Sequence, residues 1–354
     1  MGKFMNIRFQ DLEAYVPGEQ PQDKKYIKLN TNESPFPPSP FAQRMARQAA
    51  GDLQLYSDPE CGALTKVAAE YFGVDPSNII FGNGSDEVLD FAFAAFCDAL
   101  HPAFFPDVTY GFYPVFAARN CVPFKELPVK DDMTVDPKDY TELKGTLFIA
   151  NPNAPTGIAL PLKDIEKLAA EDPERLVAVD EAYVDFGGES ALPLIKKYSN
   201  LLVVRTFSKS RSLAGGRLGM GFACPDIIGD LKKIKYSINP YNVNSMTAAA
   251  GIGAILDEEY FKANVKTTVK TRNRTVKALT KLGFTCTDSK ANFIFARHSK
   301  LSGAEVYTRL REKGVLVRYF DKERLRPYVR ITVGSPEEMK ILADTLKKIV
   351  GETI

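Results

Sequence analysis

A lysine and an arginine lie on either side of a glycine-rich segment in the second half of the chain. Lys209 closes the sequence RTFSK, which follows an apolar run, and Arg217 stands within the sequence GGRLG shortly afterwards. Burial and a nearby positive charge both favour the neutral form of a lysine amine, which is the nucleophile that forms a Schiff base. A single lysine is usually a solvated surface group, so this interpretation needs support from other motifs.

Three other motifs carry groups that suit a small charged ligand. Residues 81–86 (FGNGSD) form a glycine turn before a helix start, where free N–H groups favour a phosphate. Residues 151–157 (NPNAPTG) form a stiff loop that could hold an amide over a planar ligand. Asp180 begins DEAY directly after an apolar run, where α/β sheets bind their ligands. Each motif alone also has a structural explanation as an N-cap, a rigid loop or an ion pair, so only their combination indicates a site.

Short apolar segments that alternate with helical spacing must position these motifs. Apolar positions recur every three or four residues in 64–72 and 86–96, and helices are also expected at 163–170 and 225–235. The apolar runs between the helices show no polar alternation, as in strands covered on both faces. These runs are residues 78–81, 146–150, 176–179, 201–205 and 218–222. Their order predicts an α/β domain with a mostly parallel sheet covered by helices.

The pattern differs at the two ends of the chain, which predicts three parts. The first forty residues are rich in proline and indicate an extended arm, residues 1–40. The large α/β domain is expected to cover residues 41–244. A helical region at 245–282, interrupted near Asp257, then leads into a smaller α+β lobe, residues 245–354. Its predicted elements, in β-α-β-β-α order, are residues 292–296, 303–312, 315–318, 329–333 and 336–349.

Composition excludes several classes of protein. The 354 residues carry a formal net charge of +2, which is too balanced for a protein that coats nucleic acid. No apolar run approaches the ~20 residues of a membrane helix, and the start of the chain shows no secretory signal. Five scattered cysteines and two histidines predict reduced, cytoplasmic thiols and no metal site. The chain also lacks the sequence motifs of serine hydrolases, P-loop nucleotide triphosphatases and Rossmann dehydrogenases.

The four motifs together carry a resemblance to a known family. G-x-G-S-D, N-P-N-A-P-T-G, D-E-A-Y and T-F-S-K followed by G-x-R-x-G, in this order, resemble the motifs of pyridoxal-phosphate aminotransferases with the aspartate-aminotransferase fold. Within that superfamily the chain is most similar to the histidinol-phosphate aminotransferases. The segments that carry this similarity are LEAYVPG (12–18), LNTNESP (29–35), YSDPE (56–60), TYGFY (109–113), VR (317–318) and VRITVG (329–334). The resemblance covers nearly the whole chain and implies fold type I of the pyridoxal-phosphate enzymes.

The resemblance implies a role for each motif in holding pyridoxal phosphate. Lys209 would bind it as an internal aldimine and then move a proton between substrate and cofactor, while Asp180 would keep the ring nitrogen protonated. Tyr183 would hydrogen-bond to the phenolic oxygen, and Tyr110 would stack on the ring. The other implied cofactor-binding positions, mostly near the phosphate, are Gly84, Ser85, Asp86, Thr206, Ser208, Arg217 and, from the neighbouring subunit of a homodimer, Tyr56.

One position departs from the family's pattern. The asparagine that usually precedes Pro-Thr-Gly and contacts the phenolic oxygen is Ala154 in this chain. Asn153 stands one position earlier, and it is the candidate that replaces the missing amide.

The resemblance also implies the substrates, which are a small amino-phosphate and a 2-oxo acid. Arg330 would bind the α-carboxylate of glutamate and help hold the phosphate of the other substrate. Arg318 would add a second charge for that phosphate, Tyr15 would close over it from the arm, and Asn32 is the remaining substrate-binding position. Two arginines and a tyrosine suit a doubly charged phosphate better than an uncharged ring. The implied reaction is the transamination of L-histidinol phosphate with 2-oxoglutarate.

Other interpretations share much of this machinery. An L-threonine-phosphate decarboxylase or an aromatic-amino-acid aminotransferase would use the same lysine, aspartate and arginine, so these residues do not discriminate. A non-catalytic regulator with this fold usually has an added DNA-binding domain, for which two lobes in 354 residues leave no room. A plain α/β protein would need four independent coincidences in the right order.

Overall fold

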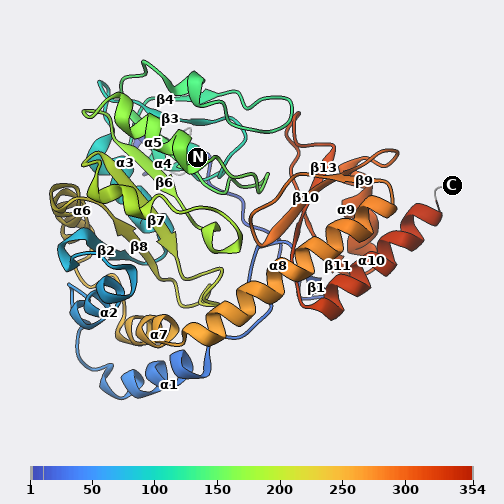
Figure 1. Cartoon of the computed structure of the whole chain (residues 1–354), viewed down its shortest axis with the longest axis horizontal. Coiled ribbons are helices and arrows are strands. Elements are labelled where there is room, and N and C mark those ends of the chain that lie inside the picture. The colour runs from blue at the N-terminus through green and yellow to red at the C-terminus, as the bar shows by residue number, and fades with distance from the viewer. Residues whose placement is uncertain (1–2, 11, 353–354) are drawn as a thin grey trace.

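The larger of the two main sheets has seven strands, and the predicted mostly parallel arrangement is confirmed (Figure 1). The computed structural model describes residues 3–10 and 12–352. β8 runs antiparallel to both of its neighbours, and the other neighbouring strands are parallel. The order across the sheet is β2 (Ile79–Gly82), β8 (Gly219–Phe222), β7 (Leu201–Thr206), β6 (Val177–Asp180), β5 (Thr146–Ala150), β3 (Ala103–Pro106) and β4 (Phe124–Leu127).

Helices cover both faces of this sheet, and the strand side chains alternate between two apolar cores. Val177 and Val179 of β6, for example, face one core, while Ala178 faces the other. The first core is closed by α1 (Pro40–Ala49), α2 (Gly62–Phe72), α5 (Leu162–Glu171) and α7 (Ser245–Leu256). The second is closed by α3 (Ser85–Phe96), α4 (Tyr113–Arg119) and α6 (Pro225–Ile238). Because both faces are buried, the central strands β5, β6 and β7 are apolar along most of their length.

A smaller antiparallel sheet forms the second lobe. Its order is β12 (Arg318–Tyr319), β13 (Tyr328–Thr332), β10 (Phe293–His298) and β9 (Phe284–Cys286). Its core is built with α8 (Glu258–Lys281), α9 (Gly303–Glu312) and α10 (Pro336–Gly351). α7 packs against α1 and α2, and the long helix α8 then runs on to the smaller sheet (Figure 1). Within the described residues, no helix has the length and apolar character needed to cross a membrane.

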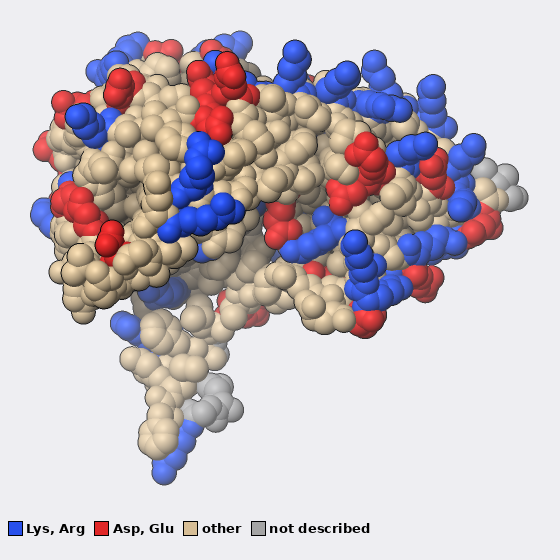
Figure 2. Space-filling view, turned by 90° about the horizontal axis from the view of Figure 1, so that it is seen from below, with Lys and Arg blue, Asp and Glu red and all other residues tan. Residues whose placement is uncertain are grey.

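The N-terminal arm begins away from the body and then joins the second lobe. In Figure 2 the first residues project from the molecule, and Phe4 and Ile7 are 92% and 80% exposed. Further along, β1 (Ile27–Lys28) pairs in parallel with β11 (Val315–Leu316), and the next residues continue beside β13. Residues 1–2 and 11 of the expected arm, and residues 353–354 of the expected C-terminal lobe, lie outside the described residues.

Two features of the sheets differ from the sequence-based expectation. The segment predicted as one strand at 315–318 is divided, since β11 pairs with the arm and β12 pairs with β13. Strands β3, β4 and β9 were not predicted. β4 has mostly exposed residues, because it lies at the edge of its sheet, so its apolar signal is weak.

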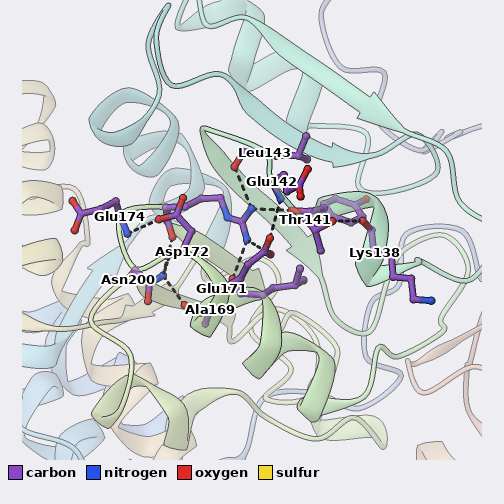
Figure 3. A network of polar contacts seen from close by, with 12 residues as sticks. Lys138, Thr141, Glu142, Leu143, Ala169, Glu171, Asp172, Glu174 and Asn200 are labelled. Carbon is purple, nitrogen blue, oxygen red and sulfur yellow. Dashed lines mark hydrogen bonds and ion pairs between the residues drawn. The ribbon is translucent and has the colours of Figure 1, made fainter.

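A buried arginine, Arg175, lies just before β6, at the end of the large sheet opposite the carboxyl ends of the parallel strands. Figure 3 shows the polar network at this end of the sheet, with Leu143, Glu171 and Asn200 labelled. The guanidinium of Arg175 donates to the backbone carbonyls of Tyr140, Leu143 and Leu168, and it pairs with Glu171 at 2.9 Å. Asn200 donates to three further carbonyls in the same region. These contacts satisfy carbonyls of loops and of the last turn of α5, which have no partner in a strand or helix, so the network is structural.

Replacing Arg175 by methionine is expected to lower the free energy of unfolding by roughly 2–4 kcal/mol, because three buried carbonyls and Glu171 lose their donor. Urea denaturation measures this change. Lys167→Met is the matched control, since Lys167 pairs with Asp164 at a site where its side chain is 71% exposed, and its loss should cost below about 0.5 kcal/mol. Equal stability of the two variants would contradict a structural role for Arg175.

Candidate active site

The predicted motifs meet at the carboxyl ends of neighbouring strands. Asp180 ends β6, Thr206 ends β7, and the loop that carries Ala154 follows β5. The start of α3 lies beside them because β2 ends in the glycine turn. Nine of the predicted cofactor-binding residues line one cavity here: Ser85, Asp86, Tyr110, Asp180, Tyr183, Thr206, Ser208, Lys209 and Arg217.

One end of this cavity is built for an anion. α3 begins at Ser85, so its first backbone N–H groups have no partner within the helix. The guanidinium of Arg217 lies beside this helix start and pairs with Asp86 at 3.0 Å. Gly84 has a φ of 89°, and a Cβ there would lie 2.5 Å from Nη2 of Arg217. The positive φ therefore favours glycine at this turn, and the helix start, Arg217 and Ser208 together can hold a phosphate.

A buried carboxylate lies at the other end of the cavity. Asp180 accepts hydrogen bonds from the N–H of Ala182 at 3.1 Å and from the hydroxyl of Tyr113 at 3.3 Å. No arginine or lysine of the described chain forms an ion pair with it, and burial raises the pKa of Asp180 to about 7. A carboxylate without a cation is costly inside a protein, so this site fits a ligand that presents a protonated ring nitrogen. Tyr113 was not predicted as a site residue, although it belongs to the motif TYGFY.

The raised pKa of Asp180 predicts how the stability of the cofactor-free protein depends on pH. Between about pH 4 and about pH 7 the folded state keeps a proton on Asp180 that the unfolded state has released. The free energy of unfolding therefore falls as the pH rises through this range. Asp180→Asn removes this contribution, so the variant should lose less stability between pH 5 and pH 7 in urea denaturation. The same pH dependence in both proteins would contradict the burial of this charge.

Lys209 lies between the first cavity and a second one. Its amine is 3.5 Å from the carbonyl oxygen of Thr31 and 5.9 Å from the centre of the Tyr183 ring. Four residues line both cavities: Tyr110, Ala154, Tyr183 and Lys209. The hydroxyl of Tyr110 donates to Asp86 at 2.8 Å, and burial raises the pKa of Tyr110, so this phenol stays neutral. The lysine amine can therefore reach groups bound in either cavity.

The second cavity contains a guanidinium without a carboxylate partner. The guanidinium carbon of Arg330 lies 5.4 Å from the ring centres of both Phe293 and Phe320. Within the described residues, its one hydrogen bond is donated to the carbonyl oxygen of Asn30 at 3.2 Å. Its Nε is buried and has no hydrogen-bond partner among the described residues. Desolvation lowers the pKa of Arg330 from its ordinary value. A partly buried guanidinium in this state indicates an anionic ligand, because no Asp or Glu of the described chain forms an ion pair with it.

The other predicted substrate residues also line this cavity. Arg318 donates to the carbonyl oxygens of Val16 and Pro17, so it holds the arm in place. Tyr15 stacks on Phe112 with the ring centres 4.4 Å apart. Asn32 lies at the wall, and Lys322, which was not predicted, adds a cation. The second cavity is therefore cationic along the side formed by the arm and the smaller sheet.

Three of the predicted cofactor residues do not line the cavity: Gly84, which still lies beside Arg217 at the start of α3, Asn153 and Tyr56. The amide of Asn153 is occupied by the carbonyl oxygen of Val108 and the hydroxyl of Thr109, each at 2.8 Å, and it faces the opposite side of its loop. The interpretation of Asn153 as a replacement for the missing asparagine is therefore not supported by its position. Tyr56 is 84% exposed, stacks on Tyr241, and lines neither cavity of its own chain.

Comparison with known proteins finds the same family throughout. The family model for aminotransferase class I and II matches residues 24–346. A histidinol-phosphate aminotransferase from Brachyspira hyodysenteriae is 46% identical over 352 residues, which cover 99% of each chain. One from Clostridium botulinum is 45% identical over 353 residues, covering 99% of this chain and all of the other. The crystal structure of histidinol-phosphate aminotransferase from Sinorhizobium meliloti in complex with pyridoxal-5'-phosphate is 25% identical with a TM-score of 0.90, covering 100% of this chain and 99% of that one.

Proposed function

The chain belongs to the class I and II aminotransferase family, and from this membership we propose that it is a pyridoxal-phosphate-dependent histidinol-phosphate transaminase. The reaction is the reversible transfer of the amino group of L-histidinol phosphate to 2-oxoglutarate, giving imidazole-acetol phosphate and L-glutamate. One observation carries the proposal. Lys209 lies between two cavities. The first has a helix start that suits an anion and a buried carboxylate, and the second has two arginines.

The residues of the first cavity fit pyridoxal phosphate. When bound, this cofactor supplies an electron sink for the carbanion that forms when the amine-bearing carbon loses its proton. Asp180 would pair with the ring nitrogen, which explains a buried carboxylate without a cation. The start of α3, Ser208 and Arg217 would hold the phosphate, and the amine of Lys209 would hold the aldehyde carbon. The hydroxyl of Tyr183 would face the phenolic oxygen.

Lys209 then acts as the acid and base of the reaction. With a substrate amine bound beside it, the free Nζ would take the proton from the amine-bearing carbon of the substrate. The same Nζ would then give that proton back as the amino group is exchanged. A position at the wall of both cavities suits this task, because the amine could reach groups bound in either one.

The cations of the second cavity account for the two substrates. Arg330 would bind the α-carboxylate of glutamate with its free donor atoms, and it would help hold the phosphate of histidinol phosphate. Arg318, together with Tyr15, would add the second contact to that phosphate. One pair of arginines can thus serve two anionic substrates that bind in turn.

A product assay tests the proposed function. A mixture of candidate amines, namely histidinol phosphate, threonine phosphate, phenylalanine and tyrosine, is incubated with the holoenzyme and 2-oxoglutarate, and mass spectrometry identifies the products. The expected result is imidazole-acetol phosphate together with an equal amount of glutamate. Release of CO₂ from threonine phosphate would favour a decarboxylase, and preferred turnover of phenylalanine or tyrosine would favour an aromatic aminotransferase.

We further propose that the active form is a homodimer with composite sites, located in the cytoplasm. Exposed apolar side chains that a second copy could cover support the dimer, as does an arm that leaves the body of the molecule (Figure 2). The residues concerned are Phe4, Ile7, Val16, Leu53, Leu55 and Tyr56. All five cysteines are free thiols, which supports a reducing compartment.

Mixing two inactive variants is expected to restore activity if Tyr56 completes the site of the neighbouring subunit. A Lys209→Ala subunit keeps Tyr56, and a Tyr56→Ala subunit keeps Lys209, so each hybrid dimer has one site with both groups. Activity should reach roughly a quarter of the wild-type value if the subunits mix at random. Full activity of the Tyr56→Ala protein on its own, or of a monomer at assay dilution, would contradict the composite site.

A further inference from the structure

Asn32 joins the arm to the smaller sheet and to the cofactor cavity. It is 1% exposed and has a φ of 54°, a left-handed conformation that asparagine tolerates better than most residues. Its backbone N–H donates to the hydroxyl oxygen of Thr332 on β13 at 2.9 Å, and its carbonyl oxygen accepts from Asn292 at 3.0 Å. These two bonds fix the backbone of Asn32 and therefore the point from which its side chain extends.

The hydrogen bonds around Asn32 determine which way its amide faces. The hydroxyl oxygen of Thr332 accepts a hydrogen bond from the backbone N–H of Asn32. The hydroxyl proton of Thr332 is donated to Oδ1 of Asn32, 3.1 Å away. The amide nitrogen must then face the other way, and it donates to the hydroxyl oxygen of Tyr183 at 3.0 Å. Tyr183 is an acceptor in this contact, so its own proton remains available for a group in the cavity.

Tyr183 is the hydroxyl that can donate at the junction of the two cavities. Of the four residues that line both, Ala154 has only a methyl group and Lys209 is the amine itself. Tyr110 already donates its proton to Asp86. A ligand oxygen bound beside Lys209 would therefore receive its hydrogen bond from Tyr183.

We propose that Asn32 is a positioning residue that directs the hydroxyl proton of Tyr183 toward the phenolic oxygen of the bound cofactor. The inference rests on the proposed function, because it needs pyridoxal phosphate on Lys209. A donor to the tyrosine oxygen makes the tyrosine a stronger donor in turn. A hydrogen bond from Tyr183 to the negative phenolic oxygen would reduce how strongly that oxygen stabilises the protonated form of the neighbouring Lys209 nitrogen. The pKa of this nitrogen would therefore be lower.

Other charged and titratable groups face the same point and affect the same proton. They come from both lobes and stay unchanged in the variants below, so they set a constant background. They are Asp86, Tyr110, Asp180, Lys209, Arg217, Glu33, Tyr15, Arg318 and Arg330.

The test is a pH titration of the visible absorbance of the holoprotein, which reports the proton on the Lys209-linked nitrogen. Asn32→Asp keeps the shape and tolerates the same backbone angles, but its carboxylate accepts the tyrosine proton and turns it away from the cofactor. Asn32→Gly removes the side chain and also suits a φ of 54°. Tyr183→Phe removes the donor, and Asn32→Asp combined with Tyr183→Phe shows whether the new charge acts without the hydroxyl. Thermal melting checks that each variant folds.

Tyr183→Phe is expected to raise the pH midpoint by about one unit, the size of one hydrogen bond to a charged group. Asn32→Asp should raise it by a similar amount, Asn32→Gly by less, and the double variant should match Tyr183→Phe alone. Midpoints unchanged in both Asn32 variants, while Tyr183→Phe shifts, would overturn the inference. An equal rise from Asn32→Asp without the hydroxyl would overturn it too, because the charge would then act directly. A wild-type protein without a visible band would overturn the cofactor assignment itself.

Discussion

Replacing Lys209 by alanine is expected to lower kcat by about ten-thousandfold or more, the largest effect of any single substitution in this chain. The variant loses both the amine that holds the cofactor and the base that moves the proton. Its stability should change little, because the side chain makes a single long hydrogen bond, to Thr31. Steady-state kinetics with histidinol phosphate and 2-oxoglutarate measure the loss, and urea denaturation checks the fold.

Chemical labelling separates this role from a general effect on the site. Borohydride reduction of the wild-type holoprotein should fix a phosphopyridoxyl group on Lys209, and peptide mapping should find it there. Lys290→Ala is a suitable control, because Lys290 is paired with Asp288 on the surface and should keep full activity and full labelling. A label on any other lysine, or an active Lys209→Ala protein, would refute the assignment.

The second large effect is expected from the two arginines, which should differ in their selectivity. Arg330→Ala should lower kcat/KM by roughly 100-fold for both histidinol phosphate and glutamate, since each anion loses a charged hydrogen-bond donor. Arg318→Ala should lower kcat/KM for histidinol phosphate by roughly 10- to 100-fold and change that for glutamate far less. The ratio between the two substrates is therefore the informative quantity.

Arg326→Ala is the matched control for the two arginine variants. Arg326 lies on the same lobe but pairs with Asp321 and lines neither cavity. Its loss should therefore leave kcat/KM unchanged for both substrates. If Arg318→Ala lowered kcat/KM equally for both substrates, the loss of the hydrogen bonds from Arg318 to the arm carbonyls would explain the effect. The role of Arg318 in binding the phosphate would then be wrong.

Much of the fold was predictable because its signals are local. Buried strands such as β5, β6 and β7 are continuous apolar runs, and the polar residues that follow them lie at their carboxyl ends, as expected. The reversed direction of β8 was not predictable, since an apolar run does not encode direction. The pairing of β1 with β11 depends on two residues from each end of the chain, which give no periodic signal.

The site shows the same division between local and distant information. Lys209, Asp180 and Arg217 come from strand ends and a glycine turn, and each motif carries its own signal. The position of Asn153 was not predictable, because sequence does not show which side of a loop an amide faces, and here the amide donates to the carbonyl oxygen of Val108. The contact of Asn32 with Tyr183 joins residues 151 positions apart, so only the folded chain shows it.

One half-reaction tests the central claim most directly. The holoprotein is mixed with L-histidinol phosphate and no acceptor, and its visible absorbance is followed through a single turnover. We expect the absorbance of the Lys209-linked cofactor to disappear as the amino group moves to it, and to return when 2-oxoglutarate is added, with one glutamate formed per site. An absorbance that histidinol phosphate leaves unchanged, or that phenylalanine removes as fast, would contradict the account.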